Sequence, residues 1–442
     1  MIPDIVLINT RPLAHVNRSE PLNLLALAAY LEANGLKPII HDEVRPITNL
    51  DELLGKVKYA GITANTCAYP RAVELNRRIK EQYPRVTTIV GGVHPTTMPD
   101  QALRDGFDIV VRDEGELALC AILRDGTREG IVSGEHIGDQ ELYRPARHLI
   151  DMDFYKRMKL NEPQNSSLDF IEPANTPAAS MLATRGCPFS CIFCHNIWRH
   201  SRMRFMPVER VIEEIAFLKA QYGVGAIWFL DDHMFIKKSW GMSLFQQLIE
   251  SRLNVYWASS ARADSMDEEL LEAAARAGCR QLTIGVESGS DNVLKTLDKR
   301  ASVAQNYEAI RRCRKYGIRT LSAIMLGNPG ETRDDIRKTA EFLIRSKTDS
   351  ASISYLTPYP GTRLWEMCEE KGLLPDNIDF SRFDGQEAAP VQISDFTRSQ
   401  LAGFKRSMLL RFYLQRHTFP GLLRRIIANP GSMFRKITTS LR

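Results

Sequence analysis

Several features of other protein classes are absent from this chain of 442 residues. It has no GxGxxG and no GxxxxGK(S/T) motif, so neither a dinucleotide fingerprint nor a P-loop supports a nucleotide site. No apolar run approaches the ~20 residues that a helix needs to cross a bilayer. Eight cysteines are too few for a disulfide scaffold in a chain of this length, which argues against a disulfide-stabilised secreted protein.

The two ends of the chain also lack features. Met1–Asp4 leads straight into an apolar run without the pattern of a signal peptide, so we expect a cytoplasmic, reducing setting. From Phe396 to Arg442 there is no Asp or Glu, whereas Arg and Lys recur. Three interpretations of this basic region stay open: a packed helical cap, a basic face for an anionic or lipid-like substrate, and a contact with a membrane surface. Nucleic-acid binding is not expected, because no recognition motif accompanies the charge.

The first part of the chain alternates predicted strands with predicted helices. The composition of the whole chain, with 44% hydrophobic and 25% charged residues, is typical of a globular protein. The alternation implies a parallel, doubly wound sheet, whose ligands bind beyond the carboxyl ends of the strands. Those loops are 63–66, 91–96 and 112–116. The expected elements are strand 5–9, helix 21–34, strands 38–42 and 59–63, helix 70–82, and strands 87–92 and 108–112.

From about residue 178 the chain repeats a strand followed by a helix six times. Six such units predict a partial (β/α)6 barrel of the TIM type, whose active site belongs at the C-terminal ends of its strands. The strands are expected at 179–184, 226–230, 254–259, 281–286, 320–326 and 351–356.

Three cysteines lie in the loop after the first of these strands, in Arg185-Gly186-Cys187-Pro188-Phe189-Ser190-Cys191-Ile192-Phe193-Cys194. Thiolates are preferred ligands of iron–sulfur clusters, and a loop of this size can fold three of them around one cluster. A [4Fe–4S] cluster held in this way keeps one iron open to a substrate or cofactor. The alternative is a zinc site, for which His195 or His200 would supply the fourth ligand.

The CxxxCxxC spacing, with Phe193 directly before the last cysteine, resembles the signature of radical SAM enzymes. The resemblance implies that Cys187, Cys191 and Cys194 bind a [4Fe–4S] cluster whose open iron is chelated by S-adenosylmethionine. In this family the reduced cluster cleaves S-adenosylmethionine to methionine and a 5′-deoxyadenosyl radical. An external electron donor of flavodoxin or ferredoxin type is therefore an expected partner.

Polar residues at the later strand ends are candidates for contacts with S-adenosylmethionine. Asp231 and Asp232 resemble the strand-two region that contacts the methionine amino group, and Glu287 resembles the acceptor for the ribose. Arg262 is expected to pair with the carboxylate, which a guanidinium fork binds through two hydrogen bonds. An ordinary loop role is the alternative for each, and it is the favoured interpretation of His233 over a substrate-side acid or base. The predicted set is Phe193, Asp231, Asp232, Arg262, Glu287, Ser288 and Ile324.

The N-terminal half resembles the cobalamin-binding domain that precedes many radical SAM barrels. The matching features are the helix after Pro21-Leu22, Gly91–His94 and Asp113–Glu116, in that order. In the family these loops surround the corrin ring, and glycine allows a bulky ligand close to the backbone. The Asp-x-His-x-x-Gly motif of the mutases is absent, so His94 is not assigned as a cobalt ligand, and a polar loop role is its equal alternative. The predicted cobalamin contacts are Thr63, Asn65, Thr66, Gly91, Gly92, His94, Glu114 and Gly115.

We therefore predict an α/β protein in four parts. These are a doubly wound, Rossmann-like domain of the cobalamin-binding type at 1–140, a linker at 141–177, a radical SAM partial barrel at 178–375, and a basic helical region at 376–442.

The resemblance implies a cobalamin-dependent radical SAM enzyme, most commonly a class B methyltransferase acting on an unactivated carbon or phosphorus of a small-molecule or lipid-like substrate. No catalytic residue is predicted. One alternative is a cyclase or oxidative rearrangement enzyme with the same cofactors. Another is a methylthiotransferase, but that class carries further cluster cysteines in its N-terminal domain, and only Cys67 and Cys120 precede this triplet. The last is a non-catalytic zinc-binding protein.

Overall fold

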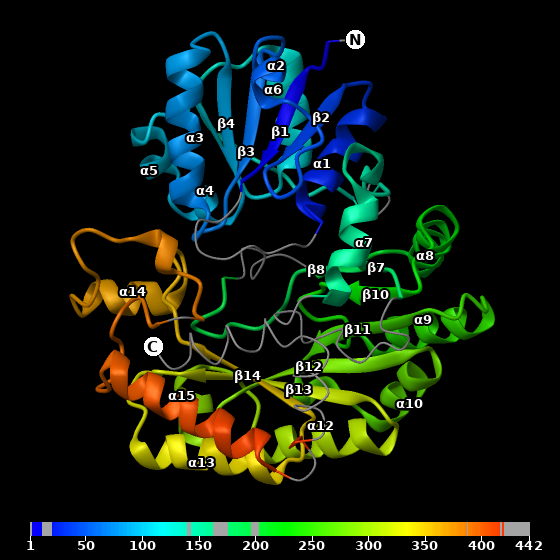
Figure 1. Ribbon diagram of the computed structural model, residues 1–442, viewed down its shortest axis with the longest axis vertical. Coiled ribbons are helices and arrows are strands. Elements are labelled where there is room, and N and C mark those ends of the chain that lie inside the picture. Colours follow the sequence, from blue (N-terminus) through cyan, green and yellow to red (C-terminus); the bar gives the residue numbers. More distant parts are fainter. Residues whose placement is uncertain are drawn as a thin grey trace. The chain divides into compact units, whose positions relative to one another are not determined.

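The structure is a computed structural model, shown in Figure 1. It describes residues 2–10, 20–138, 143–161, 176–195, 203–386, 388–415 and 418–419. The chain forms two compact units, and neither is a single stretch of sequence. The N-terminal unit comprises residues 1–156, 194–200 and 358–384. The barrel unit comprises residues 157–193, 201–357 and 385–442.

The N-terminal unit is built on a six-stranded parallel sheet with the order β2-β1-β3-β4-β5-β6. The strand order reverses at β1, and this is the point at which doubly wound sheets bind ligands. Apolar residues such as Ile5, Ile8 and Val90 are fully buried because helices cover the sheet. The strands are β1 (Ile5–Asn9), β2 (Pro38–Asp42), β3 (Tyr59–Thr63), β4 (Thr87–Gly91), β5 (Ile109–Arg112) and β6 (Gly130–Ser133). The helices are α1 (Leu22–Ala33), α2 (Leu50–Leu54), α3 (Tyr69–Gln82), α4 (Val93–Thr97), α5 (Pro99–Arg104) and α6 (Gly115–Asp125).

The barrel unit is built on a second six-stranded parallel sheet, whose strands follow in chain order, β7-β10-β11-β12-β13-β14. Trp257, Phe245 and Leu282 belong to a large apolar core between this sheet and its helices. The strands are β7 (Ala178–Met181), β10 (Ala226–Phe229), β11 (Tyr256–Ala261), β12 (Cys279–Glu287), β13 (Arg319–Leu326) and β14 (Ser350–Tyr355). The helices of the repeat are α8 (Val208–Tyr222), α9 (Lys238–Glu250), α10 (Glu268–Arg276), α11 (Asp291–Thr296), α12 (Val303–Lys315) and α13 (Arg333–Arg345).

The two sheets confirm the predicted fold class. Every predicted strand is present, and β6 is an additional strand of the N-terminal sheet. Its four residues alternate between half-buried and exposed positions, so they lack the apolar run that marks the other strands. A two-stranded antiparallel sheet, β8 (Thr184–Arg185) with β9 (Arg204–Phe205), follows β7 directly in the barrel unit. The predicted domain boundaries remain predictions.

The segments after β14 divide between the two units. Helix α14 (Arg363–Glu370) and the short helix η4 (Phe380–Arg382) belong to the N-terminal unit. Helix α15 (Arg398–Tyr413) joins the core of the barrel unit through Leu401, Met408 and Phe412, as the packed-cap interpretation expects. The remaining elements are η2 (Arg147–Leu149), α7 (Met152–Asn161) and η3 (Ala263–Ser265).

The basic segments predicted at 420–428 and 433–441 lie outside the described residues. Within the part of the chain that the structure describes, no helix has both the length and the apolar character that crossing a membrane requires.

Candidate active site

The cysteine loop starts at the end of β8. Cys187 and Cys191 are half-buried, Cys194 is exposed, and none of the three forms a disulfide. Burial raises the pKa of Cys187. Among the described residues, no three His, Cys, Asp or Glu side chains gather closely enough to hold a metal ion. The donor set fits an iron–sulfur cluster, because three thiols at this spacing share one loop and none is fully buried. Their role as ligands stays a prediction.

The residues considered for a zinc site are placed only in part. His195 is half-buried, whereas His200 lies outside the described residues.

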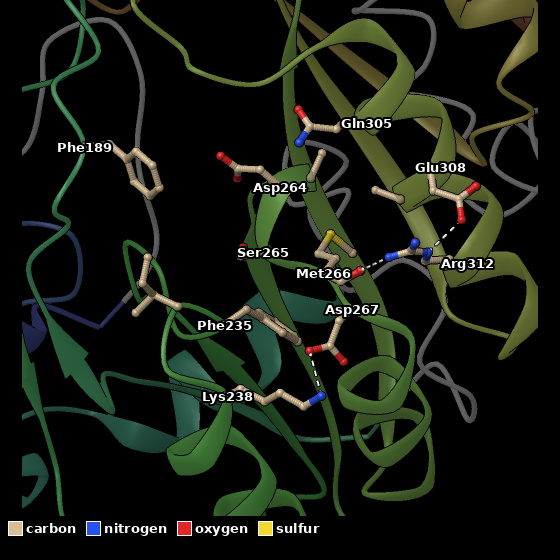
Figure 2. A pocket seen from close by; sticks show the side chains of 13 residues that line it. Phe189, Phe235, Lys238, Asp264, Ser265, Met266, Asp267, Gln305, Glu308 and Arg312 are labelled. Carbon is tan, nitrogen blue, oxygen red and sulfur yellow. Dashed lines mark hydrogen bonds and ion pairs between the residues drawn. The ribbon is translucent and has the colours of Figure 1, made fainter.

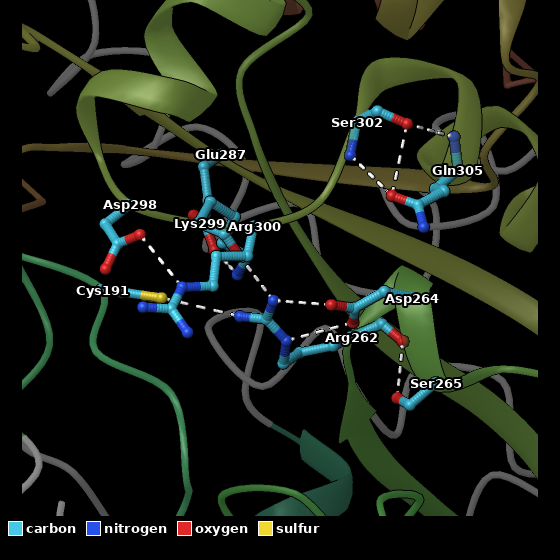
Figure 3. Close-up of polar contacts among 10 residues, drawn as sticks. All are labelled: Cys191, Arg262, Asp264, Ser265, Glu287, Asp298, Lys299, Arg300, Ser302 and Gln305. Atoms are coloured by element: carbon cyan, nitrogen blue, oxygen red, sulfur yellow. Dashed lines mark hydrogen bonds and ion pairs between the residues drawn. The ribbon is translucent and has the colours of Figure 1, made fainter.

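Arg262 follows β11 and lies buried beside the cysteine loop (Figure 3). Its guanidinium stacks on the ring of Phe189 at 3.6 Å, and its Nη1 lies 3.5 Å from the Sγ of Cys191. Two of its nitrogens donate to the carboxylate of Asp264 at 3.1 and 2.8 Å. The fork that we expected to bind the ligand's carboxylate is therefore occupied by Asp264. The remaining nitrogen places positive charge beside a sulfur that would be anionic as a ligand.

Glu287 ends β12 with a left-handed backbone, φ 62°, where the pairing register with β13 shifts. Its Oε1 accepts a hydrogen bond of 2.6 Å from the Nζ of Lys299, and both side chains are buried. Among the described residues, no other side chain donates to this carboxylate. A buried carboxylate needs such a cation, since an unpaired buried charge is costly. The predicted acceptor is thus held in place by a residue that the sequence did not indicate.

The two aspartates after β10 differ. Asp231 is buried, and its Oδ1 accepts hydrogen bonds from the N–H of Ala183 at 3.0 Å and the hydroxyl of Thr184 at 2.6 Å. Burial raises the pKa of Asp231 to about 7 although these donors favour the ionised form. Asp232 is exposed and accepts a hydrogen bond from the N–H of Gly186. Asp231 therefore braces the chain before the cysteine loop, and Asp232 is the better placed of the two for a ligand.

His233 is completely buried, and neither ring nitrogen has a hydrogen-bond partner. Its ring lies 5.6 Å from that of Phe189. Burial lowers the pKa of His233 to about 4, and the positive charge of Arg262 acts in the same direction. The imidazole is therefore neutral at pH 7, which makes it a donor and an acceptor without a partner in the barrel interior.

The remaining predicted contacts are less polar. Ser288 is buried, and its hydroxyl lies 3.1 Å from that of Thr339 on α13, so it ties β12 to a helix. Ile324 is buried in the barrel core, and Phe193 is half-buried. Their contacts with a ligand stay predictions.

A cavity of about 470 Å³ opens beside Phe189 (Figure 2). The loop Asp264–Asp267 forms one of its walls. Its charged residues are largely paired: Lys238 lies 3.1 Å from Asp267, and Arg312 donates to the carbonyl of Met266 at 3.0 Å. The other lining residues are Phe235, Ile236, Ala263, Gln305, Glu308 and Ala309. Phe189 is the residue of the cysteine loop that lines this cavity.

In the N-terminal unit, the loops after β3, β4 and β5 meet at one edge of the sheet, because Thr63 pairs with Gly91 and Gly91 with Val111. Gly92 has φ 107°, and a Cβ there would lie 2.8 Å from the carbonyl oxygen of Ala64. Only glycine fits this close approach between two loops. The Asp113 N–H donates to Thr96 at 3.0 Å and ties the third loop to the second.

His94 lies at the centre of this edge and is completely buried. Its ring stacks against Tyr69, with 4.0 Å between centroids, and meets the edge of Phe380 at 4.7 Å. Neither ring nitrogen has a hydrogen-bond partner, and burial lowers the pKa of His94 to about 3. The two orphaned nitrogens are a donor and an acceptor that suit a ligand with amide groups, as cobalamin is. A contact with cobalamin stays a prediction.

The other predicted cobalamin contacts described next lie at the end of β3, or in the loops after β3 and β5, before and after the segment that carries His94. The Oγ1 of Thr63 accepts a hydrogen bond of 2.8 Å from Asn23 at the start of α1. Asn65 accepts one of 2.9 Å from the N–H of Ala68, and Thr66 is buried. Glu114 is buried with His136 3.5 Å away, and Gly115 starts α6.

The functional candidates that sequence reasoning missed are Lys299, Asp264, Asp298 and Ser190. They lie in helix connections and in the cysteine loop, where no spacing rule links them to the strand ends. A signal was present in one case only: Lys299 lies in Leu297-Asp298-Lys299-Arg300, a charged turn between two helical patterns.

These features define a class of protein. It is an α/β enzyme with a three-cysteine loop at the end of the first barrel strand and a doubly wound unit before it. Comparison of the sequence with models of known protein families supports this class. The model of the Radical SAM superfamily matches residues 181–343, and that of the B12 binding domain matches residues 15–123. The chain is thus a radical SAM enzyme with an N-terminal B12-binding domain, which confirms the predicted family and its cofactor set of [4Fe–4S] cluster, S-adenosylmethionine and cobalamin.

Individual relatives extend over both units. The chain is 29% identical over 363 residues to an uncharacterised methyltransferase of Pyrococcus horikoshii, covering 80% of this chain and 78% of that protein. It is 27% identical over 422 residues to the anaerobic magnesium-protoporphyrin IX monomethyl ester cyclase of Rubrivivax gelatinosus, covering 88% and 73%. Among solved structures, the radical S-adenosylmethionine methyltransferase TsrM of Kitasatospora setae, with cobalamin and a [4Fe–4S] cluster bound, is similar with a TM-score of 0.68. The identity is 18%, with 85% of this chain and 79% of that chain covered, so the likeness is one of fold.

Proposed function

We propose that this chain is a cobalamin-dependent radical SAM methyltransferase that acts on an unactivated carbon of a small molecule. The observation that carries the proposal is the presence, in one chain, of two features: ion pairs beside a three-cysteine loop, and a buried, unpartnered histidine next to glycines at the sheet edge of the B12-binding unit. Methylation of phosphorus is the variant of the same reaction that the sequence also allows. The Pyrococcus relative, named as a methyltransferase, supports methyl transfer over other radical chemistry.

When bound, the cluster and S-adenosylmethionine supply a carbon-centred radical, and cobalamin supplies a carrier for the methyl group. The chain's own residues hold and orient these groups. Cys187, Cys191 and Cys194 are the cluster ligands, and Arg262 places positive charge beside Cys191. Glu287 is the acceptor for ribose hydroxyls, with the Lys299 ammonium group holding its Oε1. Phe193, Ser288 and Ile324 complete the predicted site.

In the N-terminal unit, the loop edge around His94 is the proposed cobalamin site. The ring nitrogens of His94 would gain partners from the amide groups that border the corrin. Gly91 and Gly92 would let the ligand approach the backbone. Because Tyr69 and Phe380 flank the imidazole on its faces and edge, His94 is a contact residue and is not proposed as a cobalt ligand.

A cyclase or oxidative rearrangement enzyme with the same cofactors is the second candidate. The Rubrivivax cyclase favours it, because the match covers 88% of this chain. A methylthiotransferase has less support, since only Cys67 and Cys120 precede the triplet.

Product analysis separates these functions. The full chain, reconstituted anaerobically, is incubated with reductant, S-adenosylmethionine and extracts of the native organism, and 5′-deoxyadenosine and S-adenosylhomocysteine are measured together. We expect both products, which supports methyl transfer. Deoxyadenosine alone would favour cyclisation or rearrangement. A single zinc per chain without a visible chromophore would overturn the enzyme proposal in favour of a zinc-binding protein.

A reductant is the partner that this chemistry requires, and flavodoxin or ferredoxin is the proposed type. The proposed setting is cytoplasmic. The basic C-terminal region provides a candidate surface for an anionic substrate or a membrane, and α15 already uses its apolar face within the barrel core.

A further inference from the structure

Residues 297–302 connect α11 to α12, and we refer to the first four of them, Leu297–Arg300, as the strap. The strap contacts the cysteine loop at two points. The N–H of Ile192 donates to the carbonyl of Leu297 at 3.1 Å. The hydroxyl of Ser190 donates to the Oδ2 of Asp298 at 2.7 Å. Both contacted residues lie next to Cys191, so the strap determines where the middle of the loop lies.

Its other contacts reach the barrel interior (Figure 3). The Nζ of Lys299 donates to the Oε1 of Glu287 at 2.6 Å. The backbone carbonyl oxygen of Lys299 accepts a hydrogen bond from the Nη2 of Arg262 at 2.5 Å. Lys299 therefore binds two residues of the predicted S-adenosylmethionine site, Glu287 through its side chain and Arg262 through its backbone.

The backbone of the strap is held in an uncommon conformation. Asp298 and Arg300 have φ values of 47° and 54°, which residues other than glycine rarely adopt. The guanidinium of Arg300 donates to Asp298 at 3.1 Å and to Ser190 at 3.2 Å. Such a conformation persists where its surroundings over-determine it, and it is typical of functional sites. The two turns direct Lys299 inward while its neighbours face the cysteine loop.

The strand opposite the strap leaves room for this ion pair. A Cβ at Gly285 would lie 2.6 Å from the Oε1 of Glu287 and 2.8 Å from the Nζ of Lys299. Any larger residue at position 285 would displace the pair. The site is therefore shaped around the contact between Lys299 and Glu287.

We propose that the strap couples the cluster site to the S-adenosylmethionine site, with Lys299 as the positioning residue of Glu287 and Asp298 as the positioning residue of the cysteine loop. Neither residue touches the ligand. Lys299 fixes the position of the Glu287 carboxylate, and Asp298 holds Ser190 of the cysteine loop. The inference rests on the proposed function, because it assumes that Glu287 serves S-adenosylmethionine.

The test of Lys299 uses the full chain, reconstituted anaerobically. Binding of S-adenosylmethionine is followed by the change that it causes in the electron paramagnetic resonance spectrum of the reduced cluster. We expect Lys299→Met to retain wild-type iron but to weaken binding about 10- to 100-fold, as loss of residues that orient ligand contacts does elsewhere. Lys299→Arg should restore part of the affinity. The matched control is Lys295→Met, an exposed lysine of α11, which should bind as wild type does.

A double mutant separates positioning from folding. If Lys299 acts through Glu287, then Glu287→Gln and Glu287→Gln with Lys299→Met should bind S-adenosylmethionine equally weakly. Because the double mutant removes both charges, it leaves neither of them buried without its partner. It can therefore be measured even if Lys299→Met alone fails to fold. A further loss of affinity on adding Lys299→Met to Glu287→Gln would overturn the positioning role.

The role of Asp298 has its own measurement, the rate at which a chelator removes iron from the reconstituted protein. We expect Asp298→Ala to release iron several-fold faster than wild type, because the loop loses its contact through Ser190. Asn292→Ala, an exposed change on α11, is the control and should leave the rate unchanged. Equal rates for Asp298→Ala and wild type would overturn this part of the proposal.

The outcomes also separate the strap from the function on which it rests. A wild-type protein whose cluster spectrum does not respond to S-adenosylmethionine would contradict the proposed function itself. A wild-type response that Lys299→Met leaves at full affinity would contradict only the strap.

Discussion

The carboxyl edges of the two sheets differ in how they place charge. In the barrel unit, two ion pairs meet at the strand ends, where Arg262 binds Asp264 and Lys299 binds Glu287. In the N-terminal unit, the loops after β3 and β4 place glycine, threonine and the neutral His94 beside aromatic rings, and the buried Glu114 follows in the loop after β5. The two proposed ligands differ as well. S-adenosylmethionine carries separate positive and negative groups, whereas a corrin presents a broad face bordered by neutral amides.

The largest expected effect comes from removing the predicted cluster ligands of the barrel unit. Replacing Cys187, Cys191 and Cys194 by alanine should reduce the iron content from about four atoms per chain to almost none, and abolish formation of 5′-deoxyadenosine. The measurement is iron and sulfide analysis after anaerobic reconstitution, with deoxyadenosine assayed by chromatography. Cys120→Ala, a buried thiol of the N-terminal unit, should keep both. Four irons in the triple variant would contradict the ligand assignment.

A comparison of two buried ion pairs sharpens the contrast. Glu287 with Lys299 lies in the barrel unit, and Glu20 with Arg147, 3.2 Å apart, lies in the N-terminal unit. Glu287→Gln removes the carboxylate that Lys299 binds, and Arg147→Met removes the guanidinium that donates to Glu20. Each should lower the free energy of unfolding, by up to about 3–5 kcal/mol in urea denaturation. Only Glu287→Gln should also weaken S-adenosylmethionine binding. Equal binding losses in both variants would mean that general destabilisation explains them.

His94→Phe should have opposite effects on stability and on ligand retention. It removes two buried nitrogens that have no partner, so the free energy of unfolding of the unliganded protein should rise by about 1–3 kcal/mol. Retention of corrin after gel filtration should fall. The control is His148→Phe, since His148 is exposed and should affect neither quantity. Full corrin retention in His94→Phe would exclude His94 from the cobalamin site.

The smallest expected effect is a difference in acid response. The pKa of His94, about 3, lies below its ordinary value of about 6.5, so the unfolded chain takes up the proton first. The contribution of the neutral His94 to the free energy of unfolding is complete above pH ~6.5. It is lost as the pH falls towards 3, by up to about 1.4 kcal/mol per pH unit. The sign is opposite for Asp231, whose pKa of about 7 exceeds its ordinary ~3.8, so the folded barrel unit gains stability as the pH falls between these values.

Urea denaturation at pH 7 and pH 5.5 tests this difference. Compared with wild type, His94→Phe should lose about 1 kcal/mol less stability on acidification, and Asp231→Asn should lose more. Identical acid responses in all three proteins would contradict both assignments.

The fold could be predicted from the sequence because the patterns that specify its strands are local. Each predicted strand is an apolar run between turn residues, and β6 escaped because Gly130–Ser133 has no such run. The site followed only in part. The positions of Glu287 and Arg262 at strand ends come from periodicity, but their partners Lys299 and Asp264 depend on how loops fold back, which no local pattern encodes. Likewise, nothing in the sequence indicated that Phe380 would contact His94.

That last contact has a consequence for how the protein is made. Residues 358–384 complete the N-terminal unit, yet they leave the ribosome after all six strands of the barrel sheet. At ~5–20 residues per second, the ring of His94 waits roughly ten to fifty seconds for Phe380 after residue 156 has been synthesised. During that interval the ring of His94 lacks its contact with Phe380, so the N-terminal unit is completed only after the barrel sheet has been synthesised.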